Sequence, residues 1–289
     1  MTDQPRAATE LTDDQLLRYS RNILLPELDV AGQLALVNAR VLVLGAGGLG
    51  SPILLYLAAA GVGTIGIADG DVVDLSNLQR QISHTTADVG RQKVVSAAER
   101  VGAINPGVEV VPYPFRLNKE NISKIIREYD FIIEGTDNFP TKYLVNDACY
   151  FAEKPFSIGG ILRFEGNTMT HVPGSACYRC VFPQMPPAGV IPTCAEAGVL
   201  GAIAGMIGTV QATETLKYLL GIGELLTNRI LTMDALSMQW RTIPVRKDPQ
   251  CPLCGTDPEI TTLEEEEQVP CSIAPEAGTV TITTTAVER

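Results

Sequence analysis

Three glycines, Gly45, Gly47 and Gly50, follow four consecutive apolar residues at the spacing G-x-G-x-x-G. The apolar residues 41–44 predict a buried parallel strand, and the apolar stretch 51–60 predicts a helix after the glycines. In this arrangement the first glycine makes a tight turn, the second lets the backbone approach a phosphate, and the third lets the helix pack closely on the strand. The N–H groups at the positive end of the helix dipole then form an anion-binding site.

A polar loop after the next predicted strand, 64–68, extends this site. Asp69 ends that strand, where a carboxylate can accept a hydrogen bond from a ribose hydroxyl. A glycine turn without a ligand is the alternative, but strand, glycines, helix, strand and acid occur in register. The loop and the helix after it also carry two cations, Arg80 and Lys93, together with hydroxyl and amide side chains. Such a set suits a triphosphate such as that of ATP better than the pyrophosphate of a dinucleotide. The polar residues in question are Asp71, Asp74, Ser76, Asn77, Arg80 and Lys93.

The sequence has no GK[ST] ending after these glycines, so the loop is not a P-loop. Lys93 stands at the start of another predicted helix, 91–103, where an ordinary surface position is the alternative to a phosphate contact.

A carboxylate at the end of a further predicted strand indicates a divalent metal. Asp137 follows the apolar residues 131–133, and open parallel sheets bind ligands at the carboxyl ends of their strands. Beside a triphosphate, Asp137 could hold Mg²⁺ directly or through water. The alternative is that Asp137 is the N-cap of a helix that starts near Pro140.

Two CxxC pairs, Cys177 with Cys180 and Cys251 with Cys254, predict a four-thiolate zinc site. Because the pairs lie far apart in the sequence, the metal would pin the C-terminal segment to the middle of the fold. Four thiolates leave no open position for water, so the zinc would be structural. Two unrelated pairs are the alternative, and a redox role fits less well because neither pair lies in a thioredoxin-like βαβ pattern.

A further cysteine, Cys194, directly precedes an apolar stretch that predicts a helix from about 195 to 220. A helix N-terminus lowers the pKa of a thiol, because the dipole favours the thiolate. An inert small residue at a helix start is the alternative. The glycines along this helix predict close packing, in the core or at a dimer interface.

The bulk composition limits the classes of function. The chain has 289 residues, enough for one large α/β domain, and a formal net charge of −11, which disfavours nucleic acid as the main partner. The N-terminus is polar, and no apolar run reaches the ~20 residues of a membrane span. With seven cysteines, an odd number, a secreted disulfide scaffold is disfavoured. We therefore expect a cytoplasmic protein without a membrane partner.

The remaining pattern predicts a mixed sheet that is parallel at first and antiparallel later. Helices are expected at 11–22, 121–128 and 141–152, the last burying Cys149. Further strands are expected at 109–113, 155–160, 163–172, 229–234 and 239–245, with a turn at Gly166–Asn167. Residues 1–10 are expected to be a flexible N-terminus and residues 256–289 a mobile tail.

The motifs GAGGLGSP, DGDVVDLSNLQRQ, EGTDNF and TCAEAG, together with the two CxxC pairs, resemble the MoeB/ThiF/HesA family. This family comprises ubiquitin-activating-like adenylyltransferases of sulfur-carrier proteins. The resemblance implies a Rossmann-like mixed sheet flanked by helices, forming one adenylation domain over residues 11–255. It also implies ATP, Mg²⁺ and structural Zn²⁺ as cofactors, a homodimer, and a ubiquitin-like sulfur carrier ending in Gly-Gly as substrate.

The resemblance also implies roles for individual residues. RYSRNILLPE matches the N-terminal motif, whose second arginine, here Arg21, reaches the ATP of the partner subunit. Cys194 matches the cysteine that in some relatives joins the carrier covalently. The resemblance implies nucleotide contacts from Gly45, Gly47, Gly48, Gly50, Asp69, Asp71, Ser76, Asn77, Arg80, Lys93, Asp137 and Asn138.

Three questions stay open at this level. The carrier could feed molybdopterin, thiamine, cysteine or thiolated tRNA synthesis, and a separate sulfur donor is expected because no rhodanese-like stretch follows the second CxxC pair. An NAD-dependent oxidoreductase with structural zinc is an alternative, as is a non-catalytic partner that docks a ubiquitin-like protein.

Overall fold

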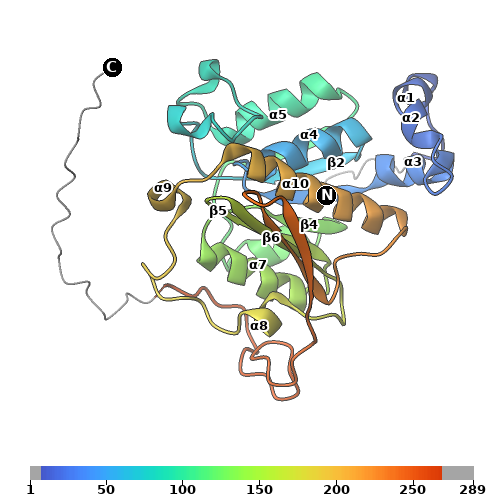
Figure 1. The fold of residues 1–289 in the computed structure, drawn as a ribbon. Helices are drawn as coiled ribbons and strands as arrows, with labels where there is room; N and C mark the ends of the chain where they lie inside the picture. Colours follow the sequence, from blue (N-terminus) through green and yellow to red (C-terminus); the bar gives the residue numbers. More distant parts are fainter. Residues whose placement is uncertain (1–7, 269–289) are drawn as a thin grey trace, which may run out of the picture.

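A mixed β-sheet runs through the protein in a computed structural model that describes residues 8–268, apart from the side chains of residues 194 and 195. Within these residues the sheet has eight strands, in the order β3-β2-β1-β4-β5-β6-β7-β8, with helices on both faces (Figure 1). The strands are β1 Arg40–Leu44, β2 Thr64–Ala68, β3 Glu109–Tyr113, β4 Phe131–Glu134, β5 Phe156–Leu162, β6 Glu165–His171, β7 Arg229–Asp234 and β8 Gln239–Pro244. The helices are α1 Asp13–Arg18, α2 Ser20–Ile23, α3 Asp29–Asn38, α4 Gly50–Ala60, α5 Lys93–Ile104, α6 Ile122–Ile126, α7 Phe139–Phe151, α8 Tyr178–Val181, α9 Cys194–Ala197 and α10 Gly201–Leu220.

The sheet changes from parallel to antiparallel at β5, which confirms the predicted mixed sheet. Strands β1 to β5 pair in parallel, and β5 to β8 pair in antiparallel. From β1 the chain first proceeds to β2 and β3 on one side, and then returns to β4 on the other. The carboxyl ends of β1 and β4 therefore form a topological switch point, the position at which open α/β sheets bind ligands.

Alternate residues of the central strands form two cores, one on each face of the sheet. Val41 and Val43 pack with α4, α5 and α10, whereas Leu42 and Leu44 pack with α6 and α7. Figure 1 shows the same division, with α4, α5 and α10 on one side of the sheet and α7 on the other. Because β1 is buried on both faces, its side chains can be continuously apolar.

The long helix predicted at 195–220 is wrong, because the chain forms two helices there. Helix α9 ends at Ala197, and α10 begins at Gly201. Gly198 between them has a φ of +77°, a left-handed conformation that interrupts a helix. Its carbonyl accepts a hydrogen bond from the backbone N–H of Arg163, and Leu200 donates to the carbonyl of Arg163. The break thus lets this segment dock against the turn after β5.

The predicted turn at Gly166–Asn167 is also wrong. Leu162 pairs with Glu165, so the turn between β5 and β6 lies at Arg163 and Phe164. Arg163 has a φ of +54°, as two-residue hairpin turns require at their first position. Gly166 instead lies within β6, where an added Cβ would meet the side chain of Ile207 at 2.4 Å. Close approach of α10, not chain reversal, requires glycine there.

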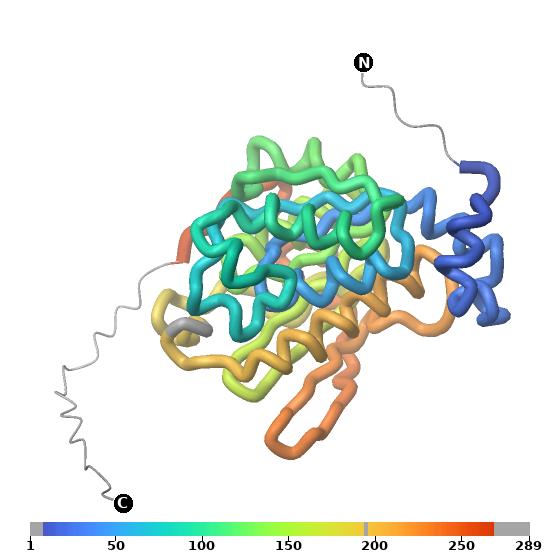
Figure 2. Tube along the Cα trace, turned by 90° about the horizontal axis from the view of Figure 1, so that it is seen from above, coloured from blue at the N-terminus to red at the C-terminus, as the bar shows by residue number. Residues whose placement is uncertain are grey.

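The N-terminal segment forms two short helices where the sequence predicts one at 11–22. The break falls at Tyr19, whose buried ring packs over Gly61 and whose hydroxyl accepts a hydrogen bond from Asn105 Nδ2 at 2.8 Å. Helices α1 to α3 lie together at one end of the molecule (Figure 2). A capping box of Thr12 and Gln15 begins α1, whereas α3 is not predicted by the sequence analysis.

The chain after Cys254 returns along the body as far as the described residues extend. The backbone N–H of Lys119 donates to Glu265 at 2.7 Å, and the ammonium group of Lys119 pairs with Glu264 at 2.7 Å. Arg179 pairs with Glu266, and Gln268 donates to the carbonyl of Pro186 at 3.1 Å. The rest of the predicted tail, 269–289, lies outside the described residues, as do residues 1–7. No helix of residues 8–268 is long and apolar enough to cross a membrane.

Candidate active site

A cavity of about 510 Å³ opens at the switch point, at the carboxyl ends of β1, β2, β4 and β5. This volume lies within the usual range for a small-ligand site. The predicted site residues that line it are Gly45, Gly47, Gly48, Asp69, Asp71, Arg80, Lys93, Asp137 and Asn138. The fold therefore brings most of the predicted residues together around one cavity.

The glycine loop has the geometry that the sequence predicts. Gly45 adopts a φ of +91°, and an added Cβ would lie 2.9 Å from the carbonyl oxygen of Gly135. At Gly50 an added Cβ would lie 1.8 Å from the carbonyl oxygen of Gly45, so no side chain fits between α4 and β1. Helix α4 has no side-chain cap at its N-terminus. The N–H of Ser51 donates to the carbonyl of Gly47 and Pro52 has no N–H, so the N–H groups that an anion can reach are those of the glycine loop at Gly47 and Gly48.

A buried histidine supports this loop, a role that the sequence analysis did not find. His84 Nε2 donates to the carbonyl of Ala46 at 2.8 Å, and Nδ1 lies 2.9 Å from the hydroxyl of Ser96. Burial lowers the pKa of His84, so the ring is neutral and its Nδ1 accepts the hydroxyl proton. Asp69 holds the other side of the loop, because its Oδ2 accepts the N–H of Ala46 at 2.9 Å.

Beside the loop, two carboxylates face two cations. Lys93 Nζ lies 3.1 Å from Asp71 and 4.0 Å from Asp69, and Lys93 is only 7% exposed. The surface position considered for Lys93 is therefore wrong. Arg116, which the sequence analysis missed, pairs with Asp71 at 3.0 Å. Partial burial raises the pKa of the Asp71 carboxyl, but the hydrogen bonds from Arg116 and Lys93 outweigh this effect, so the pKa lies below its ordinary value.

Arg80 lines the cavity, but its two predicted neighbours do not. Ser76 and Asn77 lie in a short 3₁₀ turn, Leu75–Asn77, capped by Asp74. The hydroxyl of Ser76 donates to Asp74 at 2.5 Å, and Arg80 donates to the carbonyl of Ser76 at 3.3 Å. In this structure Ser76 and Asn77 therefore shape the loop that carries Arg80, and their contact with a nucleotide stays a prediction.

Asp137 follows β4 and lines the cavity. Its carboxylate is exposed and makes no hydrogen bond or salt bridge within residues 8–268. The N-cap of α7 is Asn138, whose Oδ1 accepts the backbone N–H of Thr141 at 2.9 Å. The alternative role of Asp137 as the helix cap is therefore wrong, and its carboxylate is free to bind a ligand.

Further polar side chains line the cavity without a sequence signal of their own, among them Gln81, Arg116, Thr136 and Lys142. The Oε1 atom of Gln81 is buried with no hydrogen-bond partner in the described part of the chain. Buried polar atoms are rarely left unpaired, so a ligand or a water is expected there. Because this atom is an acceptor, it fits a donor such as a water or a ligand hydroxyl or amino group, whereas the glycine loop and the two cations Arg80 and Lys93 fit an anion.

The structure does not bring Arg21 into the cavity lining of its own chain, and the side chain of Cys194 lies outside the described part of the structure. Arg21 lies in α2 and is exposed. Cys194 begins the four-residue helix α9, directly after Thr193, which lines the cavity. Helix α9 ends at Ala197, so the long helix that the sequence predicts directly after Cys194 is absent there.

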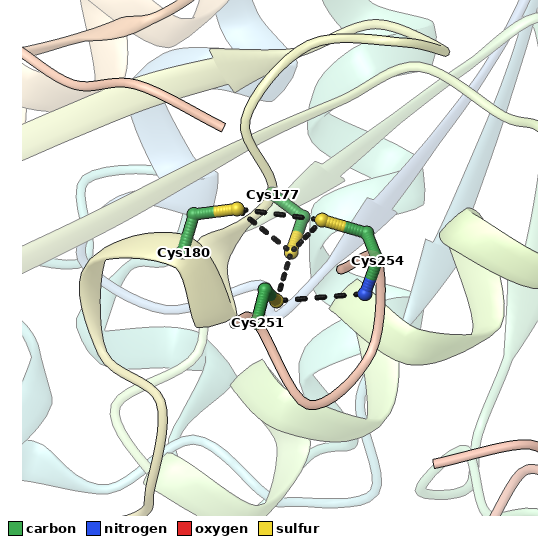
Figure 3. Close-up of side chains that lie close together, drawn as sticks. All are labelled: Cys177, Cys180, Cys251 and Cys254. Atoms are coloured by element: carbon green, nitrogen blue, oxygen red, sulfur yellow. Dashed lines mark hydrogen bonds between the residues drawn. The ribbon is translucent and has the colours of Figure 1, made fainter. Parts of the chain in front are cut away.

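The four cysteines of the two CxxC pairs meet beside α8, as the sequence predicts (Figure 3). The Sγ of Cys177 lies 3.8 Å from Cys180, 3.6 Å from Cys251 and 3.5 Å from Cys254. A tetrahedron of thiolates around Zn²⁺ has edges of about 3.8 Å, since each Zn–S bond is ~2.3 Å. The arrangement therefore fits a zinc ion with four thiolate ligands. The backbone N–H of Asp248 also donates to the Sγ of Cys180 at 3.4 Å, as the outer shell of a thiolate site requires.

The fold and the cavity define a Rossmann-like α/β protein with a glycine loop at its switch point and a four-cysteine cluster. The sequence model of the ThiF family matches residues 19–253. The chain belongs to the ThiF family, which confirms the resemblance found in its motifs.

Curated relatives and solved structures agree with this assignment. The chain is 49% identical over 276 residues to a probable adenylyltransferase/sulfurtransferase MoeZ of Mycobacterium tuberculosis, covering 94% of this chain and 69% of the relative. It is 46% identical to a sulfur carrier protein adenylyltransferase of Thermus thermophilus, covering 89% and 97%. The crystal structure of E. coli MccB has the same fold, with a TM-score of 0.72 at 23% identity over 86% of this chain and 74% of that one.

Proposed function

We propose that this protein is an adenylyltransferase that activates the C-terminal carboxylate of a ubiquitin-like sulfur carrier ending in Gly-Gly. The observation that carries the proposal is the cavity itself, whose lining combines the glycine loop, the cations Lys93 and Arg80, and the unpaired carboxylate of Asp137. The names of the relatives from M. tuberculosis and T. thermophilus support this reaction. MoeZ is also named a sulfurtransferase, an activity for which we propose a separate sulfur donor here.

In the proposed reaction an oxygen of the carrier carboxylate attacks the α-phosphorus of ATP. The bond from the α-phosphorus to the bridging oxygen breaks, so that an acyl-adenylate forms and pyrophosphate leaves. A carboxylate is already ionised at neutral pH, so no general base is required. This agrees with the two histidines, His84 and His171, which are both buried within the fold.

Catalysis then rests on position and charge. Asp69 accepts a ribose hydroxyl, and the glycine-loop N–H groups, Arg80 and Lys93 bind the phosphates. Asp137 would hold Mg²⁺, which supplies positive charge against the phosphate oxygens when bound. The phosphates would compete with Asp71 for Lys93, which is otherwise held at 3.1 Å.

Two further residues have roles in the proposal. Cys194 acts in a step after adenylation, and Arg21 acts at the site of the partner subunit. The thiolate of Cys194 attacks the carbonyl carbon of the acyl-adenylate, forming a thioester and releasing AMP. Arg21 reaches the triphosphate of the partner subunit in a homodimer. The exposure of Arg21 and its absence from the cavity of its own chain support this second role.

The test is carrier-dependent exchange of pyrophosphate into ATP by purified wild-type protein and by Asp137→Ala. We expect exchange by the wild type and a loss of about a hundredfold or more in the variant, with an unchanged melting temperature. Calorimetry with ATP and with NAD on the wild type separates the proposal from an oxidoreductase. Binding of NAD without binding of Mg·ATP would overturn it, and a wild type that binds the carrier without exchange would be a docking partner.

A further inference from the structure

A buried ion pair lies in the wall of the cavity, beneath the loop that carries Asp137. Lys142 Nζ lies 2.5 Å from Glu134 Oε2, and the two side chains are 9% and 0% exposed. Glu134 ends β4, and Lys142 lies in the first turns of α7. Such a buried pair persists only where further hydrogen bonds satisfy both charges.

The ammonium group of Lys142 has no donor left for a ligand. Besides Glu134, it donates to the carbonyl of Thr136 at 2.9 Å and to the carbonyl of Gly159 at 2.6 Å. An ammonium group has three N–H donors, and all three are accounted for. Lys93, the other lysine in the lining, is paired only with carboxylates that themselves face the cavity. Lys142 therefore acts on the protein, not on the phosphates.

The pair fixes the residue that precedes Asp137. The backbone N–H of Thr136 donates to Glu134 Oε1 at 2.8 Å, and its hydroxyl donates to the same oxygen. Because Lys142 also donates to the carbonyl of Thr136, Thr136 is held through its N–H, its hydroxyl and its C=O. On the other side, Asn138 is held as the cap of α7. Asp137 is thus a free carboxylate between two fixed residues.

We propose that Lys142, through its pair with Glu134, is the positioning residue that aims the carboxylate of Asp137 into the cavity. The proposal rests on the proposed function, in which Asp137 holds the Mg²⁺ of Mg·ATP. Lys142 ties β4, the loop after it and β5 together at one atom. Without Lys142 the loop would be more mobile. Metal binding would then have to order Asp137, at a cost in conformational entropy that lowers the affinity for the metal.

The test compares ATP affinity by calorimetry with and without Mg²⁺. Lys142→Met alone leaves Glu134 as an unpaired buried charge and endangers folding. We therefore use the double variant Glu134→Gln with Lys142→Met, in which the new amide can still accept from Thr136 and donate to a freed carbonyl. The gain in affinity that Mg²⁺ gives the wild type is expected to fall about 10- to 100-fold, while affinity without Mg²⁺ stays within about twofold.

A second comparison separates positioning from a general loss of structure. In a background of Asp137→Asn the double variant is expected to cause no further loss, because the residue it positions is already disabled. The matched control is the double variant Glu214→Gln with Lys217→Met, which changes a partly buried pair, Lys217–Glu214 at 2.5 Å, outside the cavity lining. It should lower the melting temperature without changing the gain from Mg²⁺.

Three results would overturn the proposal. They are a normal gain from Mg²⁺ in the Glu134→Gln, Lys142→Met variant, an additive loss in the Asp137→Asn background, or an equal loss in the control variant Glu214→Gln, Lys217→Met. A wild type that shows no Mg²⁺-dependent ATP binding would instead refute the proposed function on which the inference rests. Pyrophosphate exchange by the wild type distinguishes these two failures.

Discussion

Replacing Cys180 by serine is expected to release the segment around Cys251 and Cys254 from the body of the protein. Three thiol contacts of the cluster join parts of the chain that are 74 to 77 residues apart. Few apolar contacts hold this segment otherwise, since the buried cluster there contains Leu253 and three of the cysteines. A zinc ion held by the four thiolates would therefore contribute more than burial to keeping this segment in place.

The expected loss of stability follows from the length of the loop. Closing a loop of 77 residues with a cross-link stabilises the folded state by about 4–5 kcal/mol in the chain-entropy treatment used for disulfides. A domain of this size shifts its melting temperature by roughly 2–4 °C per kcal/mol. The variant should therefore melt about 10–15 °C below the wild type, and a strong chelator should lower the wild type by a similar amount.

The assay combines metal content with thermal unfolding. Zinc released on denaturation should amount to one ion per wild-type chain, and chelator should have little further effect on Cys180→Ser. Cys149→Ala is the matched control, because Cys149 is fully buried but lies outside the cluster. It should melt lower while keeping its zinc and its response to chelator. Wild-type protein that holds no zinc, or whose melting temperature ignores the chelator, would refute the reasoning.

Three further predictions concern the thiol, the dimer and the histidines. Cys194→Ala should retain pyrophosphate exchange, since the thiol acts after adenylation; loss of exchange would place Cys194 in the first step. Arg21→Ala and Asp137→Ala should each be inactive alone, and mixed subunits should regain about a quarter of the exchange per total protein in a random mixture; no recovery, with mixed dimers present, would show that each subunit uses its own arginine. Burial lowers the pKa of His84 and of His171 below the value of about 6.5 expected in the unfolded chain. The unfolded state therefore binds more protons, and stability should fall as the pH drops below about 6.5. His84→Gln should flatten that slope in denaturant titrations at pH 5.5 and 7.5, and an unchanged slope would contradict the assignment.

Local patterns predicted the sheet because they record burial directly. Four apolar residues before the glycines become β1, buried on both faces, and the strands at 64–68, 109–113 and 229–234 have the predicted bounds. The two CxxC pairs were recognisable from residue type alone, although their meeting beside α8 depends on the whole fold. Apolar strand patterns and CxxC pairs can therefore be identified from the sequence without knowledge of tertiary contacts.

The errors fall where tertiary contacts override local preference. Gly166 and Asn167 look like a turn, but Gly166 is required by the approach of Ile207. The apolar residues after Cys194 look like one helix, but Gly198 turns the chain so that it can bond to Arg163. Propensity alone cannot distinguish these cases.

The supporting residues of the cavity were missed for a related reason. Lys142 and His84 occupy ordinary helical and loop positions in the sequence, and their roles depend on which carbonyls lie near them. Lys142 donates to the carbonyls of Thr136 and Gly159, and His84 donates to the carbonyl of Ala46. Such partners can be known only once the strands are placed side by side.

The distance in sequence between the two halves of the cysteine cluster also sets an order of events during synthesis. The parallel strands β1 to β5 are complete at Leu162, before either CxxC pair has been made. The last thiol follows Cys177 by 77 residues, which a ribosome adds in about 4–15 s. A nascent chain can therefore begin to assemble the cavity before Cys251 and Cys254 have been synthesised. Binding of a metal ion by all four cysteines would then be a late folding step, which joins the segment around Cys251 and Cys254 to strands that have already paired.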